Sequence, residues 1–436
     1  MGGLTNFFQK GFFIGKRPKS RKDYLLALDI GTEFVKVLIF KAEKKSSDKR
    51  DRKRQGLVIG AGRQRQSPGH MLAGAVADID GVVLTCQKAI DQAAKMARVN
   101  PKRTVIGVAG EFIKGCTTSF MCKRENPEEP IDIVELQNII HKIQNKAFCK
   151  MRSQLAWETG KNEVEIKPIN ALLTEARIDG YQVTNPLGFQ GKEFFLSIFN
   201  VYAPLIHLRA LESIAAKLEL DLFSIAAEPY ALTRSVIGRQ GSAIFIDIGG
   251  GTTDIALVRQ GRVEGIKSLS LAGRTFTKRL GQMFDLGLSE AEEIKISRSN
   301  QKLSQNVQQK INDIFDKDVN VWLNGVELVL EEFNQDEFFP CSILLCGGGS
   351  LLPDIKNILD RKDIQKRWLE KFPFSQPFQV NFIQASQINN IIDKTGTLKG
   401  AENITPLALA NLTLEIAVDE KKVLPPILRR VVRIMR

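Results

Sequence analysis

The residues with the clearest chemical potential are two aspartates, each placed where an apolar run meets glycine and threonine. Asp29 lies in YLLALDIGTEFVKVLIF, and Asp247 lies in SAIFIDIGGGTTDIALV. Glycine lets backbone N–H groups approach a polyphosphate closely, and Mg²⁺ prefers carboxylates, often through water. Two such turns on opposite sides of a cleft therefore predict a site for a polyphosphate and its metal, with hydroxyl donors from Thr32, Thr252 and Thr253.

A third glycine-rich segment, Gly347-Gly348-Gly349-Ser350, follows the apolar run Cys341 to Cys346 and precedes an expected helix at Pro353 to Asp360. This arrangement suits a flat base or a ribose packed against backbone. Each segment alone is most often only a turn, but the three together, in this order, indicate a nucleotide site. No Walker A or G-x-G-x-x-G pattern competes with them.

Composition narrows the class of protein. The chain of 436 residues is 43% hydrophobic and 25% charged, as expected for a soluble globular protein of two to four domains. No apolar run approaches the ~20 residues of a membrane-spanning helix, and the N-terminus lacks a secretory pattern. The six cysteines form no C-x-x-C pair and the three histidines lie far apart, which argues against a structural-metal enzyme.

The net charge of +13 is concentrated in two places. Residues 41–54 carry eight basic and three acidic side chains, and residues 421–436 carry six basic and no acidic ones. The first run is interpreted as a solvated loop, with contact to an anionic surface as the alternative. Nucleic-acid binding is not expected, because the run lacks the interleaved aromatic residues that stack on bases.

The elements expected to position these residues repeat along the chain. Tyr24 to Phe40 predicts strand, turn and strand, and the run from Ser242 echoes it, as a duplicated α/β fold would. Further expected strands are 57–61, 105–108, 194–201, 222–226 and 341–346; expected helices are 80–99, 131–147, 206–218 and 353–360, with helical sequence over 275–335. The interval 361–403 is difficult to interpret and is expected to be partly loop.

At this point the sequence resembles the superfamily of actin, DnaK-type chaperones and sugar kinases. The fold that this implies is α/β: a duplicated actin-like ATPase fold of two RNase H-like halves around a nucleotide cleft, with an inserted α+β subdomain. The cofactors implied are ATP and Mg²⁺. AEPYAL (227–232) resembles the first connecting helix, whose Glu228 orients the attacking water, and AEEIK (291–295) resembles a ribose and base contact of the bacterial actins.

The site residues carried over from this resemblance fall into three groups. Asp29, Asp247 and Glu228 are expected to be catalytic, with Asp29 and Asp247 also expected to hold Mg²⁺ through water. The expected nucleotide contacts are Gly31, Thr32, Glu33, Lys36, Gly249, Gly250, Gly251, Thr252, Thr253, Gly273, Glu292, Lys295, Gly347, Gly348, Gly349 and Ser350. Leu412 departs from the family, which usually has a glycine there that lets two connecting helices cross closely.

The segment from about 112 to 192 selects a branch of the superfamily. IDGY (178–181) followed by NPLGFQGK (185–192) resembles the inserted subdomain of the bacterial division protein FtsA and its pilus relative PilM. The expected division is an N-terminal aromatic and basic extension (1–22), a first half (23–111 and 193–235), the inserted subdomain (112–192), a second half (236–274 and 341–418), a helical subdomain (275–340) and a linker with a C-terminal helix (419–436).

The C-terminal residues predict an amphipathic helix with a basic polar face. At ~100° per residue, the apolar side chains gather around Leu424, and the arginines lie on the opposite side. Such a helix suits the surface of an anionic bilayer, whereas docking on the protein's own surface is the alternative. The expected membrane residues are Leu424, Ile427, Leu428, Arg429, Arg430, Val431, Arg433, Ile434, Met435 and Arg436.

The function that the resemblance implies is FtsA-like. The protein would bind ATP with at most slow hydrolysis, self-associate, and tether the C-terminal peptide of the tubulin-like FtsZ to the cytoplasmic face of the membrane during cell division. The main alternative is a PilM-like scaffold of type IV pilus assembly that binds a membrane partner's cytoplasmic peptide. A metabolic kinase or phosphatase is a third reading, for which the sequence offers no substrate-specific acid or base.

Overall fold

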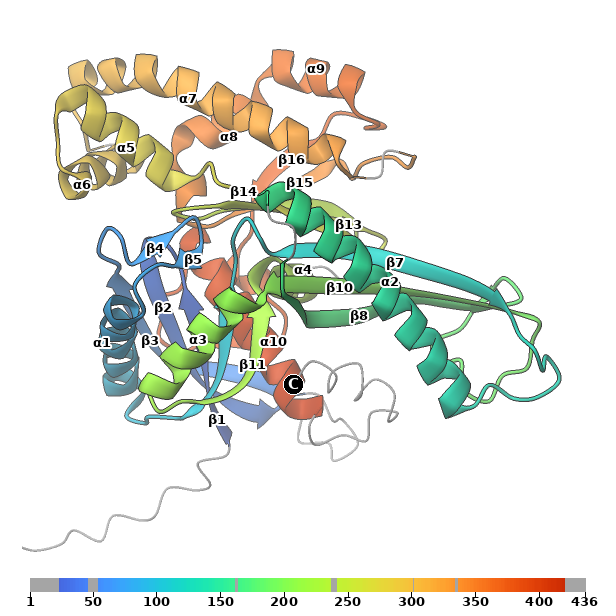
Figure 1. Cartoon of the computed structure of the whole chain (residues 1–436). Helices are drawn as coiled ribbons and strands as arrows, with labels where there is room; N and C mark the ends of the chain where they lie inside the picture. Colours follow the sequence, from blue (N-terminus) through green and yellow to red (C-terminus); the bar gives the residue numbers. More distant parts are fainter. Residues whose placement is uncertain are drawn as a thin grey trace, which may run out of the picture.

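Two β-sheets, with helices on their faces, make up the computed structural model of the chain (Figure 1). The structure describes residues 23–45, 54–160, 164–236, 241–300, 302–333 and 336–419. Within these ranges no helix combines the length and the apolar character needed to cross a bilayer. The expected amphipathic helix lies outside the described residues, as does most of the basic run at 41–54.

The first sheet has six strands in the order β11-β6-β1-β2-β3-β17. Strand β1 pairs antiparallel with β2 and parallel with β6, which is in turn parallel to β11. The strands are β1 (Tyr24–Ile30), β2 (Phe34–Lys44), β3 (Arg54–Arg65), β6 (Arg103–Val108), β11 (Asp221–Ala227) and β17 (Ile391–Asp393), and the helices that pack on them include α1 (Ile79–Ala97) and α3 (Leu205–Lys217). A short hairpin of β4 (Met71–Leu72) and β5 (Ala75–Val76) precedes α1.

The second sheet repeats this arrangement, since its strands β14-β13-β12-β15-β16 have the same order and directions as β3-β2-β1-β6-β11. The expected duplicated α/β fold is therefore confirmed. The strands are β12 (Ala243–Ile248), β13 (Thr253–Arg259), β14 (Arg262–Leu269), β15 (Ser342–Cys346) and β16 (Gln379–Phe382). Helices α5 (Gly273–Phe284), α6 (Leu288–Ser299), α7 (Gln305–Glu331), α8 (Pro353–Asp360) and α9 (Lys362–Lys371) lie on its outer side (Figure 1).

The inserted segment extends the second sheet rather than the first. Strand β7 (Lys114–Lys123) pairs with β14 through Cys116 and Gly115, and the sheet continues through β10 (Glu193–Pro204), β8 (Ile166–Ile178) and β9 (Tyr181–Gln182). Helix α2 (Ile133–Thr159) packs on these strands, and the segment projects from the body of the molecule (Figure 1). The inserted subdomain was expected to end at residue 192. Strand β10 begins at Glu193 and nevertheless lies within the sheet of the insert.

Two helices fill the space between the sheets and connect the halves at the base of the cleft. Helix α4 (Glu228–Val236) follows β11, and α10 (Ile404–Asp419) crosses it. The crossing is close because small residues meet there: the Ser235 hydroxyl lies 2.7 Å from the carbonyl oxygen of Ala231 and 3.1 Å from that of Ala408. Asn411 donates from Nδ2 to Ser235 Oγ at 3.1 Å. The two helices therefore approach each other closely at Ala408. Leu412 stands where the resembled superfamily usually has a glycine, and the crossing is close without that glycine.

Three expected elements differ in extent from the observed ones. Strand β3 begins at Arg54 and helix α2 continues to Thr159, because burial on one face compensates for polar residues that the sequence pattern treats as breaks. The interval 361–403 contains α9, β16, β17 and the short helix η4 (Ala401–Asn403), so it is more ordered than expected. Its sequence does carry periodic signals that the reading overlooked, with Ile364, Trp368 and Phe372 at helical spacing and Phe378, Val380 and Phe382 in alternation.

Replacing Asn411 with alanine should destabilise the helix crossing. Asn411 and Ser235 are both fully buried, and the change removes the donor to Ser235 Oγ. Loss of a buried hydrogen bond costs about 1–3 kcal/mol of unfolding free energy. Urea denaturation of the wild-type chain and Asn411→Ala measures this difference. The exposed Asn357→Ala on α8 serves as control and should stay within about 0.5 kcal/mol; equal effects of the two variants would contradict the expectation.

Candidate functional site

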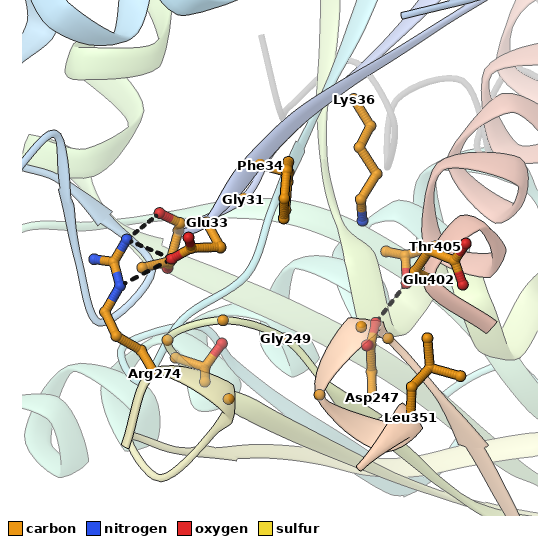
Figure 2. Close-up of a pocket in the computed structure, with 18 of the residues that line it drawn as sticks. Gly31, Glu33, Phe34, Lys36, Asp247, Gly249, Arg274, Leu351, Glu402 and Thr405 are labelled. Atoms are coloured by element: carbon orange, nitrogen blue, oxygen red, sulfur yellow. Dashed lines mark hydrogen bonds and ion pairs between the residues drawn. The ribbon is translucent and has the colours of Figure 1, made fainter. Parts of the chain in front are cut away.

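A cavity of about 720 Å³ opens between the β1–β2 turn and the β12–β13 turn. Both turns are closed by the same backbone hydrogen bond: Gly31 N–H donates to Phe34 O at 3.1 Å, and Gly249 N–H donates to Thr252 O at 2.9 Å. The volume falls within the roughly 300–1,000 Å³ typical of small-molecule sites. Figure 2 shows Gly31 and Gly249, one from each turn, among the residues that line the cavity.

The floor of the cavity combines four carboxylates with one lysine. In the first half Asp29 pairs across the strands with Lys36, and Nζ of Lys36 lies 3.3 Å from Oδ2 of Asp29. The corresponding pair in the second half is Asp247 and Asp254, so a carboxylate occupies the position of the lysine. Glu228, the first residue of α4, completes the cluster from the crossing helices. The duplicated backbone thus carries an asymmetric set of charges.

Burial and mutual repulsion shift the pKa values of these groups. Burial, reinforced by Asp29, Asp247 and Asp254, holds the pKa of Glu228 well above its ordinary range. Burial raises the pKa of Asp247, against a hydrogen bond of 2.6 Å from the Thr405 hydroxyl. Burial would favour neutral Lys36, but the attraction of Asp29, Asp247 and Glu228 outweighs it and raises the lysine pKa. The raised pKa values of Glu228, Asp247 and Asp254 favour their neutral, protonated forms, so the cluster holds protons that a bound cation could displace.

This set of donors fits a hydrated Mg²⁺ ion. In the described part of the chain no three histidine, cysteine or acidic side chains converge as direct metal ligands. Asp29 and Asp247 instead come from opposite walls of the cavity and face the same space. Mg²⁺ commonly keeps several of its waters and binds through one or two carboxylates together with substrate phosphates. A cation at the floor would favour the ionised form of these carboxyl groups over the protonated form that burial favours.

The opposite end of the cavity is suited to a nucleoside. Gly347, Gly348 and Gly349 line it with backbone, and α6 contributes Glu292 and Lys295. Lys295 Nζ donates to Gly273 O at 2.9 Å and forms an ion pair of 2.7 Å with Glu292. These bonds hold both side chains beside the glycine backbone and offer hydroxyl groups of a ribose both an acceptor and a donor.

The structure brings nearly all of the expected catalytic and nucleotide residues to this cavity, whereas their chemical roles stay predictions. Two placements were wrong. Thr253 is fully buried and donates to Leu271 O at 2.6 Å, while the Ser350 hydroxyl donates to Gly347 O at 2.7 Å. Neither lines the cavity, because both side chains point into the second half. The expected membrane residues from Leu424 to Arg436 lie outside the described residues.

Several cavity residues were missed by the sequence reasoning. Arg63 stacks on Phe34, with its guanidinium carbon 3.7 Å from the ring centroid, and lies opposite Lys36 in the β2–β3 register. The alternation of Phe34 and Lys36 along β2 could have indicated this face. Arg274 and Thr405 carried no comparable signal, because their partners lie far away in the sequence. Glu402 also lines the cavity and was missed.

The chain therefore has an actin-like fold, with two related halves around a cavity lined by glycine turns and carboxyl groups. A solved PilM–PilN type IV pilus biogenesis complex contains a chain that superposes with a TM-score of 0.59 at 16% identity, covering 89% of this chain and 98% of that one. A looser likeness, with a TM-score of 0.45 at 14% identity, links it to MreB5 of Spiroplasma citri, solved with bound AMPPNP; it covers 93% of this chain and 100% of that one.

By sequence the chain is similar to the cell division protein FtsA. The family model "Cell division protein FtsA" matches residues 244–395. FtsA of Streptococcus pneumoniae is 24% identical over 282 residues, which are 64% of this chain and 56% of that protein. FtsA of Escherichia coli K12 is 27% identical over 235 residues, or 51% of this chain and 50% of that protein. The chain thus spans about half the length of these relatives.

Asp254 should make the stability of the protein depend on pH. Burial raises its pKa from 3.8 to about 7, against hydrogen bonds from Ser268 and Thr252. The folded state therefore binds more protons than the unfolded state between these values, so stability is greatest at low pH and falls as pH rises toward 7. From pH 5 to pH 8 the wild-type chain should lose at least about 1 kcal/mol relative to Asp254→Asn. Urea denaturation of both proteins without nucleotide measures this; parallel pH profiles would contradict it.

Proposed function

We propose that the chain is an FtsA-like actin homologue that binds ATP with Mg²⁺, self-associates, and tethers FtsZ to the cytoplasmic face of the membrane during cell division. The observation that carries the proposal is the cavity itself: two equivalent glycine turns from two related halves enclose an acidic floor. The relationship to FtsA, rather than the cavity, supports the division role.

The roles proposed for the residues follow from their positions. Lys36 contacts phosphate oxygens from the first turn, and Asp29 and Asp247 hold the waters of Mg²⁺, which supplies neutralisation of phosphate charge when bound. Glu292 and Lys295 contact the ribose and base. Glu228 orients a water, but its strongly raised pKa favours the protonated carboxyl group in the free protein, and that form cannot accept a proton from the water. Slow hydrolysis is therefore expected, with the nucleotide acting on assembly.

The proposed partners engage other surfaces. The FtsZ C-terminal peptide is assigned to the helical part formed by α5, α6 and α7, where Val321 and Leu328 leave 54% and 61% of their surface exposed, seven residues apart on α7. Residues at this spacing share one helix face. The membrane contact is assigned to the amphipathic residues after 420, whose arginines each contribute about 1 kcal/mol near an anionic surface.

Removing the charge of Lys36 should weaken ATP binding. Lys36→Met deletes the only lysine on the cavity floor among the described residues, and loss of a charged hydrogen bond costs about 1.5–3 kcal/mol. This corresponds to a roughly 10- to 100-fold higher Kd for Mg²⁺–ATP. Calorimetric titration measures it, with the exposed Lys310→Met as control. An unchanged Kd in Lys36→Met, with the variant's thermal unfolding intact, would contradict the assignment.

Anionic vesicles should recruit FtsZ only through the full chain. In co-sedimentation, the wild-type protein should carry FtsZ to vesicles that contain anionic lipid, and a chain ending at residue 420 should still bind the FtsZ peptide but not the vesicles. Equal vesicle binding by both forms would refute the membrane assignment.

A PilM-like scaffold is the second candidate, favoured by the close match in fold to the PilM–PilN complex. A direct binding assay with immobilised FtsZ and PilN peptides separates the two. Capture of the PilN peptide alone would replace the FtsZ proposal, whereas capture of the FtsZ peptide alone supports it.

A further inference from the structure

Arg274 links the two walls of the cavity at its edge. It is the second residue of α5 in the second half, and every acceptor of its guanidinium belongs to the first half (Figure 2). Nη2 donates to Glu33 Oε2 at 2.9 Å and to Thr32 O at 2.8 Å, and Nη1 donates to Met71 O at 3.2 Å. Among the ion pairs of the described residues, Arg274–Glu33 is the one that joins opposite walls of this cavity.

The backbone at the same position is tied to the second glycine turn. Arg274 N–H donates to Gly250 O at 2.7 Å, and Gly273 N–H donates to Gly249 O at 3.1 Å. One residue therefore holds the second turn with its backbone and the first turn with its side chain. Any movement that separates the two turns must break the contacts of Arg274 with Glu33, Thr32 and Met71.

The two turns also pack directly against each other. A methyl group on Gly250 would lie 2.7 Å from Glu33 Cβ, and one on Gly251 would lie 2.5 Å from Thr32 Oγ1, both too close for carbon. The absence of side chains at these glycines is thus what brings Glu33 within reach of Arg274. The resulting pair is sheltered, with 16% of the Arg274 side chain and 14% of the Glu33 side chain exposed.

We propose that Arg274 is a latch that holds the cleft closed over the nucleotide and sets the rate of nucleotide release. A planar guanidinium that binds one carboxylate and two carbonyl oxygens is a directional contact, and opening the cleft would leave these groups without partners. Arg274 is a positioning residue in this role, since it ties protein to protein. The proposal rests on the nucleotide binding proposed above.

Glu33 provides a matched control for the test. It also accepts from Arg65 Nε at 2.7 Å, but Arg65 is on β3 and belongs to the same half as Glu33. Arg65→Gln and Arg274→Gln therefore each remove one arginine ion pair of the Glu33 carboxylate. Only Arg274→Gln breaks a contact between the two walls of the cleft.

The experiment measures release of a fluorescent ATP analogue with Mg²⁺ by stopped-flow displacement. Arg274→Gln should raise the dissociation rate about tenfold or more while the association rate changes less than about threefold, because removing a contact that holds the closed state acts mainly on dissociation. Arg65→Gln should change the dissociation rate less than about threefold. Arg274→Lys, which keeps the charge but loses the planar fork, should lie between Arg274→Gln and the wild-type protein.

An unchanged dissociation rate in Arg274→Gln, or an equal increase in both glutamine variants, would overturn the latch. Hydrogen exchange of the nucleotide-free proteins gives a second measure that does not depend on ATP. Arg274→Gln, but not Arg65→Gln, should lose protection at residues 29–34 and 272–276. If the wild-type chain binds no nucleotide, the proposed function fails, and this exchange pattern alone decides whether Arg274 closes the cleft.

Discussion

The structure depends on a cluster of buried carboxyl groups where its two halves meet. Asp29, Asp247, Asp254 and Glu228 are buried around one lysine, and burial raises the pKa of the last three. Each carboxylate is costly at this position, since transfer of a charge from water into a protein interior is unfavourable without a partner. A bound cation with its anionic ligand would supply the missing partner, so the cost indicates that the floor is built for binding and not for stability.

The duplication explains how the chain delivers these groups to one place. Equivalent strands, β1 with β2 and β12 with β13, end in turns with the same closing hydrogen bond. The copies differ at one decisive position, where the first half has Lys36 and the second has Asp254. One turn can therefore face phosphate oxygens while the other faces a metal, although the two backbones are alike.

Features determined by neighbouring residues could be predicted from the sequence. The predictions failed where they depended on which way a side chain points or on contacts between residues far apart in the sequence. The turns at Asp29 and Asp247 were found because glycine and an apolar run determine a turn within a few residues. Thr252 and Thr253 could not be told apart, since neighbouring residues on a strand face opposite sides and the motif does not say which side faces the cavity. Arg274 escaped notice because its acceptors Thr32 and Glu33 are more than two hundred residues away in the sequence.

The cleft is held at two places by contacts of different kinds. At the base, Ala408 and Ser235 let α4 and α10 cross closely, and buried hydrogen bonds involving Asn411 join the helices. At the edge, the contact is a charge pair with part of its surface open to water. Buried polar networks are costly to break, whereas a partly hydrated ion pair exchanges protein contacts for water more easily. Opening should therefore begin at Arg274 and leave the helix crossing intact. Release of the proposed nucleotide would then require no change in the core that joins the halves.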